Sequence, residues 1–203
     1  MHIPKGSTAQ LELVTFAQAL QAADTPNADY DVSKWLYAPN FYSEYRYILG
    51  TRGKNPLICI GINPSTAKPD DLDNTLKSVE RIALGNGFDS FIMFNVYAQR
   101  ATDPDHMEQT CNVALHNENM KAFTYILSIS EKPVVWAAWG TIIEKRDYLA
   151  DCVREMVDIG KRFGAAWCCA GAVSKKGHPH HPLYLRKDEK VKPFDIDTYL
   201  TGV

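Results

Sequence analysis

The sequence lacks any hydrophobic run long enough to cross a membrane, and residues 1–6 lack the apolar core of a signal peptide. It also lacks internal repeats and low-complexity tracts. We therefore expect a protein of the cytoplasm with no membrane partner. The net charge is only −2 over 203 residues, so there is no global basic field of the kind that coats DNA without sequence preference.

Cysteine pairs at metal-ligand spacing are missing as well. The five cysteines form an odd set without a C-x-x-C pair: Cys59, Cys111, Cys152, Cys168 and Cys169. This pattern predicts reduced, buried thiols rather than disulfides. The spacings support neither an iron–sulfur cluster nor structural zinc, and we predict no metal and no cofactor.

Apolar runs alternate with helical patterns through the middle of the chain. The runs at 56–62, 90–96, 133–139 and 165–170 are typical of buried strands, and helices are expected over 73–84, 117–129 and 141–162. This order predicts an α/β fold with three α/β/α layers around a short, four-stranded parallel sheet.

The flanking segments carry weaker patterns. Ser7 or Thr8 could cap a helix over 9–23, and residues 24–40 are rich in turn formers. Residues 41–49 are aromatic-rich and predict an edge strand or an extended lead-in. We therefore divide the chain into an N-terminal helix and irregular arm (1–40) and a single α/β domain (41–203), whose tail ends in a short helix.

Polar motifs stand at or just beyond the ends of the apolar runs. They are Gly61-Ile62-Asn63-Pro64-Ser65, Phe94-Asn95, Trp139-Gly140 and His181-Pro182. Ligands of open α/β sheets bind outside the carboxyl ends of the strands. We therefore expect these four motifs to converge on one cleft.

Two asparagines could bind a planar ligand in that cleft. Pro64 restricts Asn63 to an extended backbone, which would hold its amide at the mouth of the cleft. Asn95 ends a strongly apolar run, so its amide must be paired if it is buried, and it could contact the edge of a base. The alternatives are that the segment from Asn63 to Thr66 is only a turn and that nearby backbone satisfies Asn95.

Charged residues and histidines follow in the same regions. Arg100 could meet a phosphate or form a surface ion pair. His178, His180 and His181 invite a metal interpretation, but no carboxylate or thiolate stands at ligand spacing, so one histidine donating to a developing anion is favoured. Among Asp70, Asp71 and Asp73, one is expected to cap the following helix, and a catalytic role is open.

The tail holds the one basic stretch of the chain. Lys175, Lys176 and Arg186 flank the histidines and could face phosphates, or they could belong to a solvated charged tail.

The order of the motifs resembles a bacterial and phage domain family of unknown function, and with it the uracil-DNA glycosylase superfamily. The resemblance covers residues from about 41 to 186. It rests on Tyr45-Arg46-Tyr47, Asn63-Pro64-Ser65-Thr66-Ala67, Asp73-Asn74-Thr75, Asn95 with Arg100-Ala101-Thr102, Ala138-Trp139-Gly140, and Gly177 with His181-Pro182-Leu183-Tyr184.

The resemblance implies a parallel sheet in the order 2-1-3-4 and a pocket for a nucleobase. Asn63 would orient the attacking water, Asn95 would read the base, and His181 would stabilise the departing base. The further residues expected at this pocket are Ile62, Ser65, Thr66, Arg100, Trp139, Gly140 and Tyr184.

These features predict cleavage of the N-glycosidic bond of a modified or mismatched base in nucleic acid, a DNA-repair type of reaction, with nucleic acid or a nucleotide as partner. The alternatives are a non-catalytic module that binds a nucleobase or nucleic acid, and a hydrolase of free modified nucleotides. A metal-dependent hydrolase that uses the three clustered histidines is a further alternative.

Overall fold

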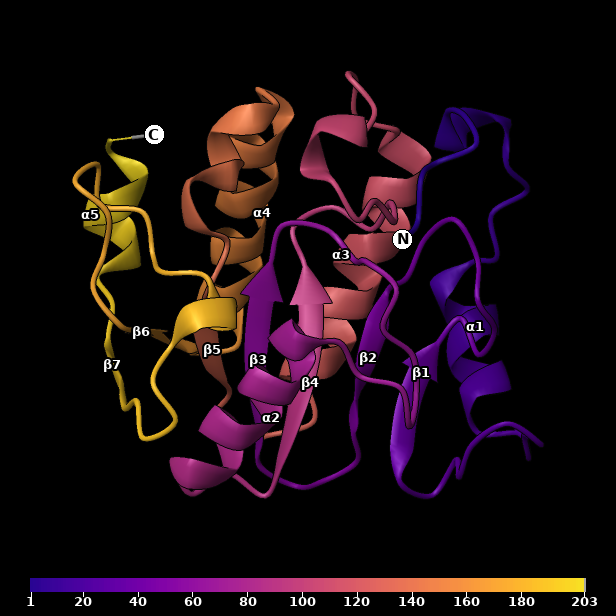
Figure 1. Ribbon diagram of the computed structural model, residues 1–203, viewed down its shortest axis with the longest axis horizontal. Coiled ribbons are helices and arrows are strands. Elements are labelled where there is room, and N and C mark those ends of the chain that lie inside the picture. Colours follow the sequence, from indigo (N-terminus) through magenta and orange to yellow (C-terminus); the bar gives the residue numbers. More distant parts are fainter. Residues whose placement is uncertain (203) are drawn as a thin grey trace.

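Seven strands form one mixed sheet in the computed structural model, which describes residues 1–202 (Figure 1). The sheet order is β1-β2-β4-β3-β5-β6-β7. The strands are β1 (Trp35–Ala38), β2 (Ile48–Thr51), β3 (Pro56–Gly61), β4 (Ser90–Asn95), β5 (Val134–Ala137), β6 (Ala166–Ala170) and β7 (Val191–Pro193).

The prediction of a four-stranded parallel sheet of the uracil-DNA glycosylase type is wrong. Strands β4, β3, β5 and β6 are parallel neighbours, but β1 and β2 extend the sheet on one side and β7 on the other, all in antiparallel pairs. The turn-rich segment 24–40 therefore contains a strand rather than an irregular arm, and β2 is not an edge strand. All of β1 is buried, so its sequence shows no alternation of apolar and polar residues.

Most of the helices begin where a side chain satisfies a free backbone N–H group. The α-helices are α1 (Phe16–Ala23), α2 (Asn74–Gly85), α3 (Val113–Leu127), α4 (Tyr148–Arg162) and α5 (Ile196–Leu200). The short 3-10 helices are η1 (Thr8–Gln10), η2 (Pro104–His106), η3 (Gly140–Lys145) and η4 (Pro182–Tyr184).

Three predicted helices need correction at their starts. Ser7 caps only η1, and α1 begins later, where Thr15 and Gln18 form a capping box. Helix α3 begins earlier than expected because Asn112 is its N-cap. The helix expected over 141–162 is divided into η3 and α4. By contrast, Asp73 caps α2 close to the predicted start.

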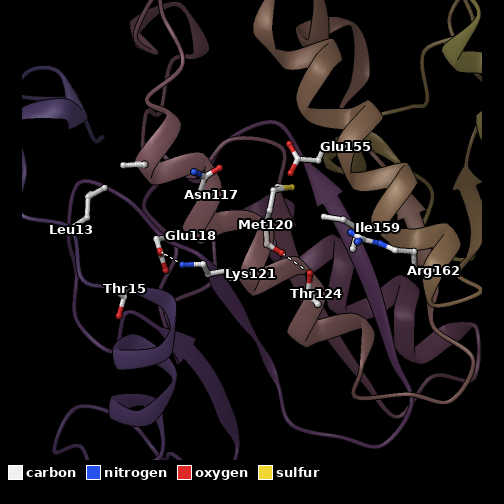
Figure 2. A pocket seen from close by; sticks show the side chains of 11 residues that line it. Leu13, Thr15, Asn117, Glu118, Met120, Lys121, Thr124, Glu155, Ile159 and Arg162 are labelled. Carbon is white, nitrogen blue, oxygen red and sulfur yellow. Dashed lines mark hydrogen bonds and ion pairs between the residues drawn. The ribbon is translucent and has the colours of Figure 1, made fainter.

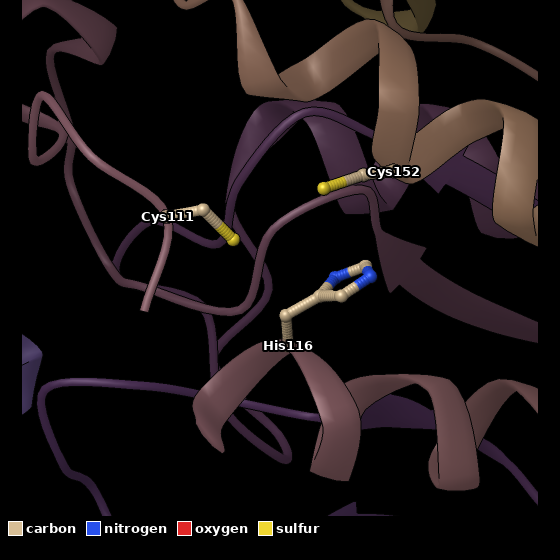
Figure 3. A group of neighbouring side chains, drawn as sticks. All are labelled: Cys111, His116 and Cys152. Atoms are coloured by element: carbon tan, nitrogen blue, oxygen red, sulfur yellow. The ribbon is translucent and has the colours of Figure 1, made fainter. Parts of the chain in front are cut away.

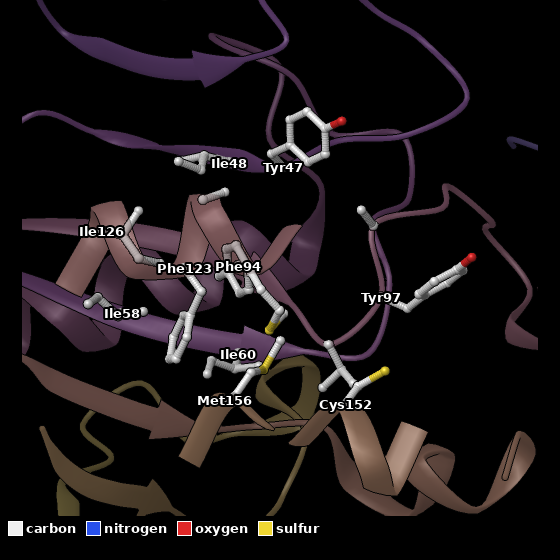
Figure 4. Close-up of a cluster of buried hydrophobic side chains, with 14 of the residues drawn as sticks. Tyr47, Ile48, Ile58, Ile60, Phe94, Tyr97, Phe123, Ile126, Cys152 and Met156 are labelled. Carbon is white, nitrogen blue, oxygen red and sulfur yellow. The ribbon is translucent and has the colours of Figure 1, made fainter. Parts of the chain in front are cut away.

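Helices cover both faces of the sheet, so its central strands are apolar on both sides. Along β3, Ile58 and Ile60 belong to the core under α1, α3 and α4, whereas Leu57 and Cys59 belong to the core under α2. Figure 4 shows the first of these cores, in which Phe123 of α3 packs with side chains of the sheet and of α4. No helix within the described residues has the length and apolar character needed to span a membrane.

Candidate functional site

A cavity of about 430 Å³ lies at the carboxyl ends of β3 and β4, beside the N-terminus of α2 and the start of η4. Gly61 and Asn95, the last residues of these two parallel strands, are neighbours in register. Six of the predicted site residues line the cavity: Ile62, Asn63, Ser65, Thr66, Asn95 and His181. The structure thus brings together residues from three separate motifs.

Asn95 lines this cavity and has an unpaired amide nitrogen. The side chain is buried, and its Oδ1 lies 3.3 Å from Nη2 of Arg46. An arginine can only donate, so the oxygen of Asn95 must face Arg46 and the nitrogen must face away from it. That nitrogen, Nδ2, has no hydrogen-bond partner within the described residues. It is therefore available to donate to an acceptor on a ligand.

Gly61 provides the space beside this amide. A Cβ at position 61 would lie 3.1 Å from Nδ2 of Asn95 and 2.6 Å from Cε of Met93. The absence of a side chain at the end of β3 therefore keeps the cavity open next to Asn95.

Arg46 places a buried cation in the cavity wall. It donates to the carbonyl of Ala67 at 3.1 Å and to Asn95, and no carboxylate in the described part of the chain forms an ion pair with it. Burial lowers the pKa of Arg46 to about 9, and the charge of Arg100 acts in the same direction, against Asp73. Arg46 is therefore charged at neutral pH without a contacting counter-ion. The family-like pattern contains this residue, but the sequence assigned it no role.

Asn63 is held by the loop that follows β3. Its amide nitrogen donates to the carbonyls of Ala101, at 2.7 Å, and Pro64, at 3.2 Å. Both amide hydrogens are thus used by the protein, which leaves the side-chain oxygen to accept a hydrogen bond in the cavity. Ser65 donates to Oγ1 of Thr102 at 3.1 Å, which ties this loop to the segment after β4.

His181 is a neutral donor in this arrangement. Its Nδ1 accepts the N–H of Leu183 at 3.3 Å, so the ring proton belongs on Nε2. Burial lowers the pKa of His181, the nearby His180 lowers it further, and the charge of Asp73 opposes both effects. Gly140 lies behind the ring, where a Cβ would be 3.6 Å from that of His181.

Asp73 is the carboxylate of the cavity. Its Oδ1 accepts the N–H of Leu76 at 2.9 Å as the N-cap of α2, and the side chain is only partly buried. Because one oxygen suffices for the cap, the other can accept a proton or a hydrogen bond from a molecule in the cavity.

Arg100 lies behind the cavity rather than in it. It donates to the carbonyls of Ser65 and Ala67 and to the hydroxyl of Tyr37, and its guanidinium stands 4.3 Å from the centre of the Tyr42 ring. It is fully buried. Arg100 therefore forms no surface ion pair; it shapes the loop that carries Ser65.

Trp139 and His178 are joined through Tyr199 by a buried chain of hydrogen bonds. Nε1 of Trp139 donates to the hydroxyl of Tyr199 at 2.9 Å, and that hydroxyl lies 2.9 Å from Nδ1 of His178. Nε2 of His178 is 2.8 Å from Glu144. These contacts anchor α5 and the histidine segment, so Trp139 and His178 stabilise the surroundings of the site without lining it.

The remaining predicted residues lie outside the cavity. Tyr184 is 84% exposed. Lys176 pairs with Glu144 at 2.9 Å and Arg186 pairs with Asp188 at 3.2 Å, while Lys175 is exposed. The ion pairs reduce the positive charge that this tail offers to phosphates.

A second and larger hollow, of about 630 Å³, lies between α3, α4 and the segment before α1 (Figure 2). None of the predicted site residues lines it. Two contacts join polar groups of its lining: Lys121 contacts Glu118 at 2.5 Å, and Thr124 donates to the carbonyl of Met120. The unpaired groups of the smaller cavity make that cavity the stronger candidate site.

Comparison with known proteins identifies one relationship. Residues 46–183 match the family described as "Protein of unknown function (DUF1643)". No curated protein and no solved structure matches the chain. The matched range contains Arg46, Asn63, Asp73, Asn95 and His181.

Proposed function

Because the chain belongs to the DUF1643 family, whose function is unknown, we propose from its cavity that it binds a nucleobase and cleaves the N-glycosidic bond with water. One observation carries this proposal: the unpaired amide of Asn95 and the unneutralised cation of Arg46 lie side by side in a buried wall. Together they suit a planar ligand that has a carbonyl oxygen and takes up negative charge.

The size and the donors of the cavity fit a base. A volume of about 430 Å³ lies within the range of about 300–1,000 Å³ that small-ligand pockets occupy. Nδ2 of Asn95 can donate to a keto oxygen, such as O4 of a pyrimidine or O6 of a purine. Ile62 and Met93 supply the apolar surface that the faces of a base would contact.

The same residues suit the proposed chemistry. Water attacks C1′ of the sugar, the bond from C1′ to the base nitrogen breaks with its electron pair on the base, and the water loses a proton. The side-chain oxygen of Asn63 orients the water, and Asp73 accepts the proton. Arg46 and Nε2–H of His181 stabilise the anionic base until it is protonated.

Two observations favour a free modified nucleotide as a second candidate substrate. Among the described residues, no phenylalanine, tyrosine or tryptophan lines the cavity, so a flipped base would lack an aromatic stacking partner. Lys176 and Arg186 already pair with carboxylates, so the neighbouring surface offers little free charge to a DNA backbone. The unpaired state of the five cysteines suits a reducing compartment, and we place the reaction in the cytoplasm.

The test is incubation of the purified chain with two panels. One holds single- and double-stranded oligonucleotides with uracil, mismatched or modified bases; the other holds the corresponding free nucleosides and nucleotides. Released base is measured by chromatography, and abasic sites by strand cleavage in alkali. The panel that yields product identifies the polymer state of the substrate.

Variants separate the proposed site from other causes of activity. We expect Asn95→Ala and His181→Ala each to lower the rate about 10²–10³-fold, as the loss of one donor to a developing anion does. Asn117→Ala, an exposed asparagine of α3, is the matched control and should retain the rate. Binding without released base would support the non-catalytic module instead, and neither binding nor product with any substrate would refute the proposal.

A further inference from the structure

Two thiols and an imidazole meet between α3 and α4, and one of the thiols comes from a distant part of the sequence (Figure 3). One ligand atom from each of Cys111, His116 and Cys152 lies within 4.8 Å of the other two. Cys111 directly precedes the N-cap of α3, His116 lies in the first turns of α3, and Cys152 lies in α4. The linear spacings showed no metal site because the third member comes from a different helix.

The histidine is oriented by a carboxylate. Nε2 of His116 is 2.9 Å from Oε2 of Glu155, whereas Nδ1 is buried and has no hydrogen-bond partner among the described residues. Figure 3 shows the ring nitrogen bonded to Cγ, which is Nδ1, on the side of the two sulfurs. The Glu155 contact places the ring proton on Nε2, so the lone pair of Nδ1 faces the thiols. This carboxylate–histidine pairing is the usual outer support of a metal-binding histidine.

No group among the described residues forms a hydrogen bond with Nδ1 of His116. His116 is 8% exposed, and a buried polar atom without a partner is costly. We propose that Cys111, His116 and Cys152 bind one zinc ion and leave a fourth coordination position open.

The chemistry of the three groups selects the ion. Thiolates and imidazole favour zinc over calcium and magnesium, which prefer oxygen ligands. Two thiolates and a neutral histidine cancel the 2+ charge of zinc, which lowers the cost of burying it. Bond lengths of about 2.3 Å to sulfur and 2.0–2.1 Å to nitrogen would place the ligand atoms about 3.5–3.8 Å apart. The present separations need to close by only about 1 Å, within reach of side-chain rotation.

The surroundings leave the fourth position free for water or another small ligand. Glu108, a carboxylate whose charge acts on Cys111, already accepts from the hydroxyls of Tyr97 and Thr8 and from the backbone of Thr8. Glu155 is engaged with His116 and also lines the hollow of Figure 2. Cys111 is only partly buried, so solvent can reach the ion from its side. Three protein ligands with an open fourth position are typical of exchangeable or catalytic zinc.

The test uses the full-length chain, purified with a reductant and freed of metal. Calorimetric titration with Zn²⁺ should give one ion per chain, and Co²⁺ should give the absorption band of thiolate-to-metal charge transfer. Cys111→Ser and His116→Gln should each weaken binding at least about 100-fold. Glu155→Gln should weaken it about 10–100-fold, the usual effect of losing an outer-shell partner.

The control is Cys168→Ala, because this cysteine belongs to the core on the other face of the sheet. It should change the affinity less than about threefold. Circular dichroism checks that each variant folds. Because Glu155 is half exposed, the Glu155→Gln variant can still be interpreted if the more buried His116→Gln variant does not fold. Failure of the reduced wild type to bind either ion, or equal binding by Cys111→Ser and wild type, would overturn the proposal. So would a finding that mild oxidation joins Cys111 to Cys152 in a protein that never binds metal. None of these outcomes depends on the proposed glycosidic activity.

Discussion

Replacing Arg46 by methionine should change the free energy of unfolding by no more than about 3 kcal/mol, although the side chain is fully buried. At roughly 1.4 kcal/mol per pH unit, a pKa lowered from 12.5 to about 9 corresponds to roughly 5 kcal/mol of unfavourable free energy for holding the charge in place. Methionine removes this cost. It also leaves the carbonyl of Ala67 and Oδ1 of Asn95 without their Arg46 donor, at about 1–3 kcal/mol each. The two effects oppose each other, and Arg100 still donates to Ala67.

Arg146→Met is the matched control. This buried arginine donates to the backbone carbonyls of Asp105, Met107, Glu108 and Lys145, and of these the carbonyl of Glu108 would keep its hydrogen bond from the hydroxyl of Tyr148. At about 1–3 kcal/mol for each of the three carbonyls left without a donor, the control should lose more than about 3 kcal/mol. Urea unfolding followed by circular dichroism measures both variants.

The comparison also tests why Arg46 is there. A cation kept in a cavity wall at a cost in stability is expected where it serves binding. Arg46→Met should therefore abolish the rise in melting temperature that a bound substrate or base causes, while the unliganded protein melts near the wild-type temperature. If Arg46→Met loses as much stability as Arg146→Met, then the contacts of Arg46 outweigh its burial, and the reasoning from its charge is refuted.

Three further predictions concern the same region. Gly61→Ala should weaken ligand binding about tenfold with little loss of stability, because the new Cβ crowds the cavity amide; unchanged affinity in a titration would contradict this. Tyr199→Phe leaves Nε1 of Trp139 and Nδ1 of His178 unpaired and should cost roughly 2–4 kcal/mol in urea unfolding, so a loss below about 1 kcal/mol would speak against the buried chain. Because the pKa of His181 in the folded protein is lowered from its ordinary 6.5, the unfolded chain binds a proton at this residue more readily than the folded chain does. The free energy of unfolding should therefore fall as the pH drops below 6.5. His181→Gln should remove that part of the pH dependence, and identical wild-type and variant profiles would exclude it.

The apolar runs were the most reliable guide to the fold. Each of the four buried runs contains a strand at or near its predicted bounds, since a strand covered on both faces needs continuous apolar sequence. Strands β1 and β7 escaped detection because they lie among turn formers or charges, and β2 only overlaps the end of the segment 41–49, for which an edge strand or an extended lead-in was predicted. Gly50 shows why pattern alone cannot find them: a Cβ there would meet the carbonyl of Phe91 at 2.3 Å, a constraint visible only once β2 lies beside β4.

The sequence predicted the candidate site at residues that stand at the ends of strands, because the position of such a residue along its strand decides which residues lie beside it. Asn63 and Asn95 follow adjacent parallel strands, whose carboxyl ends share one edge of the sheet. Their proposed roles stay predictions. Arg100 was expected to meet a phosphate or to form a surface ion pair, and it is buried. The sequence does not show that the carbonyls of Ser65 and Ala67 will surround its guanidinium.

By itself, then, the sequence determined the central strands, the cap of α2 and the edge of the sheet where polar residues gather, since these depend on local periodicity and chain direction. Only the tertiary structure decided that Arg46 is buried without a counter-ion and that Cys111, His116 and Cys152 meet. Burial and contact between distant segments depend on how helices and strands pack. The spacing of residues along the chain does not specify that packing.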